Sequence, residues 1–268
     1  MERVKHHDVV FYQFTALRPV TGLVHGIFTR RGGTSAPPFD SLNVGSTVGD
    51  DPDSVLANRR RVAEVMGFDE RDTRTVWQVH GSDVFVARRD EPATDPPPQA
   101  DGIITTDPGL PLVMRFADCV PLVFYDPVRR AVGLAHAGWR GTVAGIGPAT
   151  VRAMVRHFGS RPGDIIAGIG PAIGPCCYEV GEEVIVQVRE SFPGEDRLII
   201  PPLNGHRGPH FDLWAANEIA LRDAGVGYVE TARLCTSCLS YEFFSHRAEA
   251  GRTGRFAALI ALKDEGTA

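Results

Sequence analysis

The chain has no apolar run that approaches the roughly 18 residues needed to cross a lipid bilayer. Its first residues, from Met1 to Phe14, carry charges and two adjacent histidines where a signal peptide would have an apolar core. We therefore expect a cytoplasmic protein with no membrane partner. Positive charge is not in excess either: the formal net charge of −5 disfavours nonspecific binding to nucleic acid.

Cysteine is scarce and odd in number, and five cysteines in a chain of 268 residues argue against a disulfide framework. Cys235 and Cys238 form a Cys-x-x-Cys motif, but no second motif of this kind accompanies it, which disfavours a structural zinc ribbon. No βαβ context supports a redox pair. Cys176 and Cys177, in GPCCYEVG, are expected to pack in the core or to line the wall of a pocket.

The sequence also lacks internal repeats, and its one low-complexity stretch is the acidic, proline-rich segment 90–99. Because strand patterns continue on both sides, we expect this segment to be a surface loop and not a domain linker. The expected organisation is therefore a single domain over residues 1–268.

Short segments rich in β-branched or aromatic residues predict many strands. A turn at Asp126-Pro127 predicts that two of them form a hairpin. The expected strands are Val9–Phe14, Leu23–Phe28, Thr75–Val79, Val84–Ala87, Gly102–Thr105, Leu112–Phe116, Leu122–Tyr125, Ala131–Ala135, Ile165–Ile169 and Phe256–Leu262.

Four helices are expected between groups of strands. The first starts after a cap at Asp51 and ends before Gly67, and a second runs from Gly141 or Pro148 to Phe158. The others cover Glu182–Phe192 and the segment from Asp212 to Gly225. This alternation predicts an α/β (α+β) fold in which helices pack outside mixed sheets.

Three motifs stand out for their chemistry: WQVHG with His80, FADCVP with Cys119 and AHAGWRG with His136. Two imidazoles and one thiolate suit zinc with its fourth position open for a reactant. The hairpin brings Cys119 near His136, whereas only a predicted strand end supports His80. Each residue taken alone is more typical of a polar strand end or a core cysteine.

Carboxylates and arginines accompany these motifs. Asp83 and Asp118 are candidates to accept the second N–H of a zinc-bound imidazole, or to act as acid or base. Arg140 follows a strand and precedes a helix, a place typical of phosphate binding, and Arg31 precedes a Gly-Gly turn. Arg247 follows FFSH. Each arginine could equally serve in a surface ion pair.

The chain resembles the YfiH-like family, also described as multicopper polyphenol oxidase or laccase-domain proteins, purine nucleoside phosphorylases and peptidoglycan editing factors. The resemblance runs from about Leu23 to Leu262 and rests on RRGGTS, SLNVG, WQVHG, ADGIITT, FADCVPLVF, GLAHAGWRGT, GPAIGPCCYEVG, FDLWAANEIAL, FFSHR and TGR.

This resemblance implies a single α/β/β/α layered domain, distantly related to a cysteine-hydrolase fold. It implies one zinc ion on His80, Cys119 and His136, with copper as an alternative metal. The implied activity is phosphorolysis of adenosine, inosine, guanosine and S-methyl-5'-thioadenosine, with some adenosine deamination. The laccase description would require several coppers, and the sequence has no His-x-His pair to hold them.

In the reaction we expect, phosphate attacks the ribose anomeric carbon and a purine leaves. Arg31, Arg140 and Arg247 would bind phosphate, and Asp83 would protonate the purine. Phe243, Phe244 and Tyr178 are candidates to stack the base, although aromatic residues more often pack in cores. The expected partners are small molecules, and the chain is expected to be a monomer or a homodimer.

Two other interpretations stay open. In one, Cys119 is a thiolate nucleophile with His136 as its base, in an amide hydrolase that edits peptidoglycan precursors. In the other, the chain is a zinc-binding module without catalysis, although such a module would not need arginines and glycines around the ligands.

Overall fold

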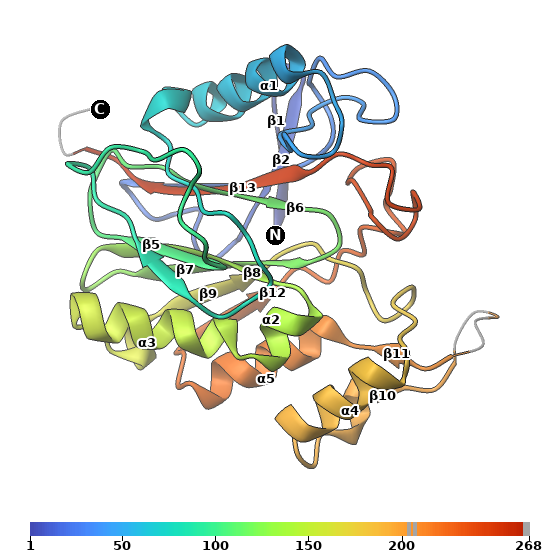
Figure 1. Cartoon of the computed structure of the whole chain (residues 1–268). Coiled ribbons are helices and arrows are strands. Elements are labelled where there is room, and N and C mark those ends of the chain that lie inside the picture. Colours follow the sequence, from blue (N-terminus) through green and yellow to red (C-terminus); the bar gives the residue numbers. More distant parts are fainter. Residues whose placement is uncertain (203–204, 206–207, 265–268) are drawn as a thin grey trace.

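The computed structural model describes residues 1–202, 205 and 208–264. Two large sheets pack face to face, and helices cover their outer faces (Figure 1). Helix α1 lies on one outer side, whereas α2, α3 and α5 lie on the other (Figure 1). The layers therefore follow the order α/β/β/α, which confirms the fold class expected from the sequence.

The first sheet has five strands in the order β1-β2-β3-β13-β6, and every neighbouring pair is antiparallel. The last strand in the chain, β13, lies between β3 and β6, so distant parts of the sequence form the centre of this sheet. The strands are β1 (Glu2–His6), β2 (Val9–Gln13), β3 (Leu23–Phe28), β6 (Leu112–Phe116) and β13 (Phe256–Leu262).

The second sheet has six strands in the order β12-β9-β7-β8-β5-β4 and is mixed. Its two outer pairs are parallel, and the pairs between them are antiparallel. The strands are β4 (Val84–Val86), β5 (Gly102–Thr105), β7 (Val120–Asp126), β8 (Ala131–Ala137), β9 (Ile166–Ile169) and β12 (Tyr228–Thr231). A separate small ribbon pairs β10 (Ile199–Ile200) with β11 (His210–Phe211).

The first and last helices begin at caps found in the sequence. Asp51 accepts the N–H of Ser54 and caps the first helix, and Gly67, with φ of 83°, follows its end. Asp212 caps the last helix by accepting the N–H of Ala215. The helices are α1 (Pro52–Val65), α2 (Trp139–Val143), α3 (Ile146–Phe158), α4 (Glu182–Ser191) and α5 (Leu213–Asp223). In the described part of the chain, none of the helices is long and apolar enough to cross a membrane.

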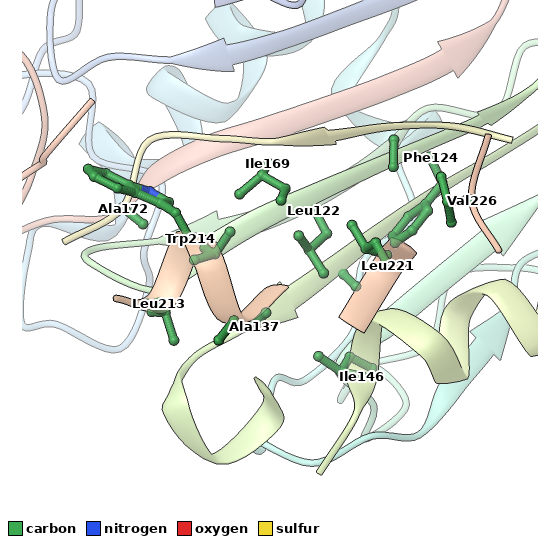
Figure 2. Close-up of a cluster of buried hydrophobic side chains, with 14 of the residues drawn as sticks. Leu122, Phe124, Ala137, Ile146, Ile169, Ala172, Leu213, Trp214, Leu221 and Val226 are labelled. Carbon is green, nitrogen blue, oxygen red and sulfur yellow. The ribbon is translucent and has the colours of Figure 1, made fainter. Parts of the chain in front are cut away.

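Apolar side chains fill the space between the layers. Phe116, Phe256 and Leu134 are fully buried between the two sheets. On the helical side of the six-stranded sheet, Leu122 and Ile169 face Leu221 of α5 (Figure 2). Each fully buried Leu, Ile or Phe contributes about 1.5–3 kcal/mol relative to an exposed one, so these interfaces fix the relative positions of the layers.

The structure departs from the predicted elements at several places. The segment Thr75–Val79 is not a strand; it makes one isolated bridge, from Trp77 to Gln99. The predicted second helix is two helices, because Gly145 adopts the left-handed conformation between α2 and α3. Strands β1, β10, β11 and β12 were not predicted, because each is short or largely exposed and lacks a clear apolar alternation.

Candidate metal centre

The β7–β8 hairpin brings Cys119 and His136 together, as the sequence predicted. Pro121 pairs with His136 and Val120 with Ala137, so Cys119, directly before β7, lies beside the end of β8. At the other end of the hairpin, the Asp126 carboxylate accepts the N–H groups of Val128 and Arg129 and stabilises the turn. The antiparallel register therefore places a thiol and an imidazole at one sheet edge.

His80 completes this cluster. One ligand atom from each of His80, Cys119 and His136 lies within 4.8 Å of the others. The two imidazole rings are close, with centroids 4.8 Å apart and planes inclined by 76°. His80 is exposed, Cys119 is half-buried and His136 is buried, so the cluster opens to solvent on the His80 side.

A single carboxylate, that of Asp101, positions both histidines. One oxygen of Asp101 lies 2.8 Å from Nδ1 of His136. The other accepts the N–H of Val79 at 3.0 Å and that of Gly81 at 2.7 Å, on either side of His80. His80 itself has φ of 62°, a left-handed conformation that this double hydrogen bond stabilises. The sequence predicted that His80 follows the end of a strand. Its position is set instead by the hydrogen bonds between the Asp101 carboxylate and the backbone on either side of it.

The carboxylate that contacts the imidazole of His136 differs from the two that the sequence predicted. We expected Asp83 or Asp118 in this role, but the carboxylate next to His136 belongs to Asp101, which is fully buried. Asp101 immediately precedes β5, and β5 pairs with β8, which carries His136. The signal in the sequence was the ADGIITT motif, in which an aspartate immediately precedes a buried strand.

Asp118 supports the loop before Cys119. Its carboxylate accepts the hydroxyl of Thr236 at 2.6 Å and the backbone N–H of Arg247 at 2.6 Å. Asp118 has φ of 79°, and these bonds hold the chain in that uncommon conformation. Asp118 therefore connects the thiol loop to two segments near the end of the chain. Asp83 is exposed, and its carbonyl accepts the N–H groups of Asp101 and Gly102.

The electrostatics of the cluster favour a thiolate. Burial alone would raise the pKa of Cys119, but the charge and hydrogen bonds of His136, together with His80, lower it below the usual value for a thiol. Burial by itself would lower the pKa of His136. The charges of Cys119 and Asp101 and their hydrogen bonds to the ring have the larger effect, so the pKa of His136 is raised. The negative charges on both sides of the His136 ring therefore stabilise its positive form when no metal is bound.

The donor set and its support fit a zinc ion. Because Nδ1 of His136 contacts Asp101, Nε2 is the nitrogen left to bind a metal, as in carboxylate–histidine–zinc arrangements. A Cβ atom on Gly138 would lie 2.9 Å from Sγ of Cys119 and 3.2 Å from Cδ2 of His80. Glycine at this position therefore leaves room beside the ligands. Three protein ligands with room for a fourth are typical of catalytic zinc sites.

Two of the three predicted arginines lie near the cluster. The guanidinium of Arg247 stacks over Tyr178, with its carbon 5.3 Å from the ring centroid. Burial, and next the charge of Cys119, raise the pKa of Tyr178, whereas the charges of Arg247 and Arg140 lower it. Tyr178 therefore lies within electrostatic range of Cys119 and of both guanidinium groups.

Arg140 and Arg31 differ in how they are held. Arg140 is the second residue of α2, and its guanidinium carbon lies 4.5 Å from the centroid of the Trp139 ring. Its Nη2 lies 3.7 Å from Oε1 of Glu183, and its side chain is 60% exposed. Arg31 is tied to the buried carboxylate of Glu242 at 3.0 Å. Arg140 is therefore available to an anion, whereas Arg31 already has a close partner.

The aromatic residues predicted to stack a base divide into two groups. Phe243 and Phe244 are fully buried in the core between the sheets, which excludes them from contact with a ligand at the surface. Tyr178 is only partly buried. Trp77 and Val79, which precede His80 in the chain, expose 44% and 45% of their surface. The sequence did not single out these two apolar side chains.

A second group of potential metal ligands consists of Cys176, Cys177, Cys235 and Cys238, whose sulfur atoms all lie within 4.8 Å of one another. The Cys-x-x-Cys motif and the adjacent cysteines Cys176 and Cys177 therefore meet in space, which the sequence did not predict. Cys176 and Cys177, which we expect to pack in the core or to line a pocket wall, are half-buried and pack against the core under the helices. A groove of about 560 Å³ lies elsewhere, between α3 and α5, and its lining includes Val151, Val155 and Ala220.

Comparisons with known proteins agree with this geometry. Residues 24–263 match the family described as multi-copper polyphenol oxidoreductase laccase. The purine nucleoside phosphorylase YlmD of Geobacillus stearothermophilus is 41% identical over 258 residues, covering 93% of each chain. A purine nucleoside phosphorylase of Deinococcus radiodurans is 40% identical over 244 residues, covering 91% of each.

A solved structure extends the agreement to the fold. The crystal structure of YlmD from Geobacillus stearothermophilus superimposes with a TM-score of 0.88 at 37% identity, covering 97% of this chain and 98% of that one. The family match covers every strand of the six-stranded sheet and the three motifs that contain His80, Cys119 and His136. The chain therefore belongs to the multi-copper polyphenol oxidoreductase laccase family, which is the YfiH-like family that its motifs resemble.

Proposed function

We propose that this protein is a zinc-dependent purine nucleoside phosphorylase whose metal ligands are His80, Cys119 and His136. Relatives that cover nearly the whole chain are named purine nucleoside phosphorylases, which supports this class of reaction. The observation that carries the proposal is the convergence of three ligand atoms within 4.8 Å, oriented by the buried carboxylate of Asp101.

His80, Cys119 and His136 would hold the zinc ion, which would supply a Lewis acid for an oxygen of the reactant. The side chains of the protein account for the remaining requirements. Asp101 keeps His136 in the tautomer that leaves Nε2 for the metal and holds the segment around His80 through two backbone N–H groups. Cys119 binds as a thiolate because its surroundings lower its pKa.

Phosphate binding is assigned to the arginines. Arg140 and Arg247 carry guanidinium groups within electrostatic range of Tyr178, which itself lies near Cys119. A guanidinium binds a phosphate oxyanion through two parallel N–H···O bonds, which also fixes its orientation. Arg31 is the third arginine of the proposal. Because its side chain forms an ion pair with Glu242, we assign it to holding the loop in place and not to direct contact with phosphate.

In phosphorolysis a phosphate oxygen bonds to the anomeric carbon, the C–N glycosidic bond breaks, and the purine takes up a proton. We assign that proton to Asp83, which is exposed and lies three positions after His80 in the chain. Trp77 and Val79 provide exposed apolar surface for the purine ring on the segment that leads into His80. The proposed substrates are adenosine, inosine, guanosine and S-methyl-5'-thioadenosine, with adenosine deamination as a side reaction.

The proximity of Cys119 and His136 would also suit a thiol nucleophile and its base, as in an amide hydrolase. That alternative gives no role to His80, although its ligand atom is within 4.8 Å of both other ligand atoms. A third ligand and an anchoring carboxylate are what a metal requires, so the geometry favours the phosphorylase.

The test measures metal content and purine release in the same preparations. We expect adenosine, inosine and guanosine to yield the free base and ribose 1-phosphate only when phosphate is present. His80→Ala, Cys119→Ala and His136→Ala should each abolish this reaction and reduce bound zinc. Arg156→Ala, an exposed change on α3, serves as the control and should leave both properties unchanged.

Three results would contradict the proposal. Purine release that does not depend on phosphate would indicate a hydrolase. Full phosphorolysis in all three metal-site variants would show that the reaction does not require a metal at this site. Loss of amide hydrolysis after alkylation of Cys119 in a metal-free protein would support the thiol nucleophile instead.

A further inference from the structure

The second thiol cluster is built from two turns that are distant in the sequence. Cys176 and Cys177 lie in a turn where the N–H groups of Cys177 and Tyr178 both bond to the carbonyl of Gly174. Cys235 begins another turn, in which Leu239 N–H bonds to the carbonyl of Cys235. A parallel bridge between Ala172 and Cys235 joins the two segments, so backbone hydrogen bonds fix the relative positions of the thiols.

The distances between the sulfur atoms match a shared ion better than a disulfide. Sγ of Cys238 lies 3.4 Å from Sγ of Cys176 and also 3.4 Å from Sγ of Cys177, and all four sulfurs lie within 4.8 Å. A disulfide would require about 2.05 Å between one chosen pair. Four thiolates arranged tetrahedrally at about 2.3 Å from zinc have sulfurs about 3.8 Å apart, inside the observed range.

Backbone N–H groups point at one of these sulfurs. Gly174 donates its N–H to Sγ of Cys235 at 3.2 Å, and Cys238 donates to the same sulfur at 3.5 Å. Such donors stabilise a thiolate and recur around metal-bound cysteines. Glycine is needed at position 174, because a Cβ atom there would lie 2.6 Å from the ring of Trp214 and 3.2 Å from Cβ of Cys235.

We propose that Cys176, Cys177, Cys235 and Cys238 form a second metal site that binds zinc through four thiolates. Each thiol releases its proton to solvent as its sulfur–zinc bond forms, and no electron is transferred. With all four positions filled by protein, the site has no place for a reactant and is structural. Soft thiolate ligands exclude Mg²⁺ and Ca²⁺, which take oxygen ligands.

This second site would stabilise the loop that carries Cys119. Ile173 donates its N–H to the carbonyl of Asp118 at 2.9 Å, and Thr236 donates its hydroxyl to the Asp118 carboxylate. Both turns of the thiol cluster therefore hold the residue that precedes Cys119. Zinc bound to the four cysteines fastens these turns to each other and keeps the wall of the first metal centre in place.

The decisive experiment uses protein in which the first centre is disabled by Cys119→Ala, purified under reducing conditions. We expect this protein to retain about one zinc per chain. After zinc is replaced with cobalt(II), we expect strong thiolate-to-cobalt charge-transfer bands and the visible bands of a tetrahedral ion. Addition of Cys238→Ser should remove the zinc and weaken these bands, whereas Ser240→Ala in the same turn should change neither.

The outcome is independent of the phosphorylase activity, because it is read from metal content and absorption. Cys119→Ala protein that is free of metal and binds no cobalt under reducing conditions would overturn the proposal. So would iron or copper in place of zinc. Should Cys238→Ser fail to fold, the cobalt titration of Cys119→Ala protein still decides, because it leaves the four cysteines intact.

Discussion

Asp101 contacts Nδ1 of His136 through one carboxylate oxygen at 2.8 Å and, through the other, accepts the N–H groups that flank His80. One buried carboxylate therefore orients one histidine directly and the other through its backbone. Burial opposes the charge on Asp101, but the hydrogen bonds from His136 and from the backbone lower its pKa below the usual range. Asp101 thus stays ionised, which keeps His80 and His136 in their positions.

The first prediction concerns this carboxylate. Asp101→Asn should weaken zinc binding at the first centre by about 10–100-fold, because an amide cannot both accept from the imidazole and hold the two backbone N–H groups. Competition with a chromophoric chelator measures the affinity. Asp83→Asn is the matched control, since Asp83 is exposed, and it should bind zinc as the wild type does. Equal affinity in all three proteins would show that Asp101 has no positioning role.

The second prediction concerns the anion. Arg140→Ala should raise the KM for phosphate by roughly tenfold or more, because a hydrogen bond to a charged group contributes about 1.5–3 kcal/mol. The KM for nucleoside should change much less. Arg152→Ala, an exposed arginine on α3, provides the comparison. A larger increase in the KM for nucleoside than in the KM for phosphate would indicate that Arg140 binds the nucleoside instead.

The third prediction concerns the space beside the metal. Gly138→Ala should weaken zinc binding while the protein stays folded, because the new Cβ would lie 2.9 Å from Sγ of Cys119. Such overpacking typically costs about 1–3 kcal/mol. Gly163→Ala adds the same atom in open space, with no atom within 4 Å, and should leave the affinity unchanged. Similar zinc affinities for the two variants would mean that the ligands tolerate the extra methyl group.

The fourth prediction concerns stability against acid. Burial lowers the pKa of His25 to about 4, and its Nε2 accepts the N–H of Phe14 at 2.8 Å. Between pH 6.5 and about 4 the unfolded chain binds a proton that the folded protein does not, so stability should fall as the pH falls through this window. The loss should approach about 3 kcal/mol at the acidic end.

Urea unfolding at pH 7 and pH 4.5 measures this loss. In His25→Asn, which keeps an acceptor for Phe14 but has no titrating ring, the difference between the two pH values should be smaller than in the wild type. Parallel losses in the two proteins would assign the acid sensitivity to other groups.

The fifth prediction concerns the number of domains. Leu134, Phe256 and Phe116 come from both sheets and form one core, and β13 joins the end of the chain to the centre of the first sheet. We therefore expect a single domain that unfolds in one transition. Far-ultraviolet circular dichroism and tryptophan fluorescence should give coincident urea curves. Two separate midpoints would divide the chain into independent units.

Local patterns were enough to predict much of the fold. Three strands have the predicted bounds: Leu23–Phe28, Gly102–Thr105 and Phe256–Leu262. In each, the polar residues next to the apolar run mark where the strand ends. Helix α1 likewise starts at the predicted cap, Asp51. By contrast, Thr75–Val79 has the composition of a strand but makes only one isolated bridge, because pairing depends on a neighbouring strand that the sequence of this segment does not specify.

The sequence alone determined the ligand types and the pairing of Cys119 with His136, because one short hairpin connects them and its register follows from local alternation and a turn. Only the tertiary structure decided that Asp101, and not Asp83 or Asp118, supports His136, and that Cys176 and Cys177 meet Cys235 and Cys238. These contacts join segments that are distant in the chain. They depend on the order of strands in a sheet and on how the loops beyond its edge pack, and no short stretch of sequence encodes either.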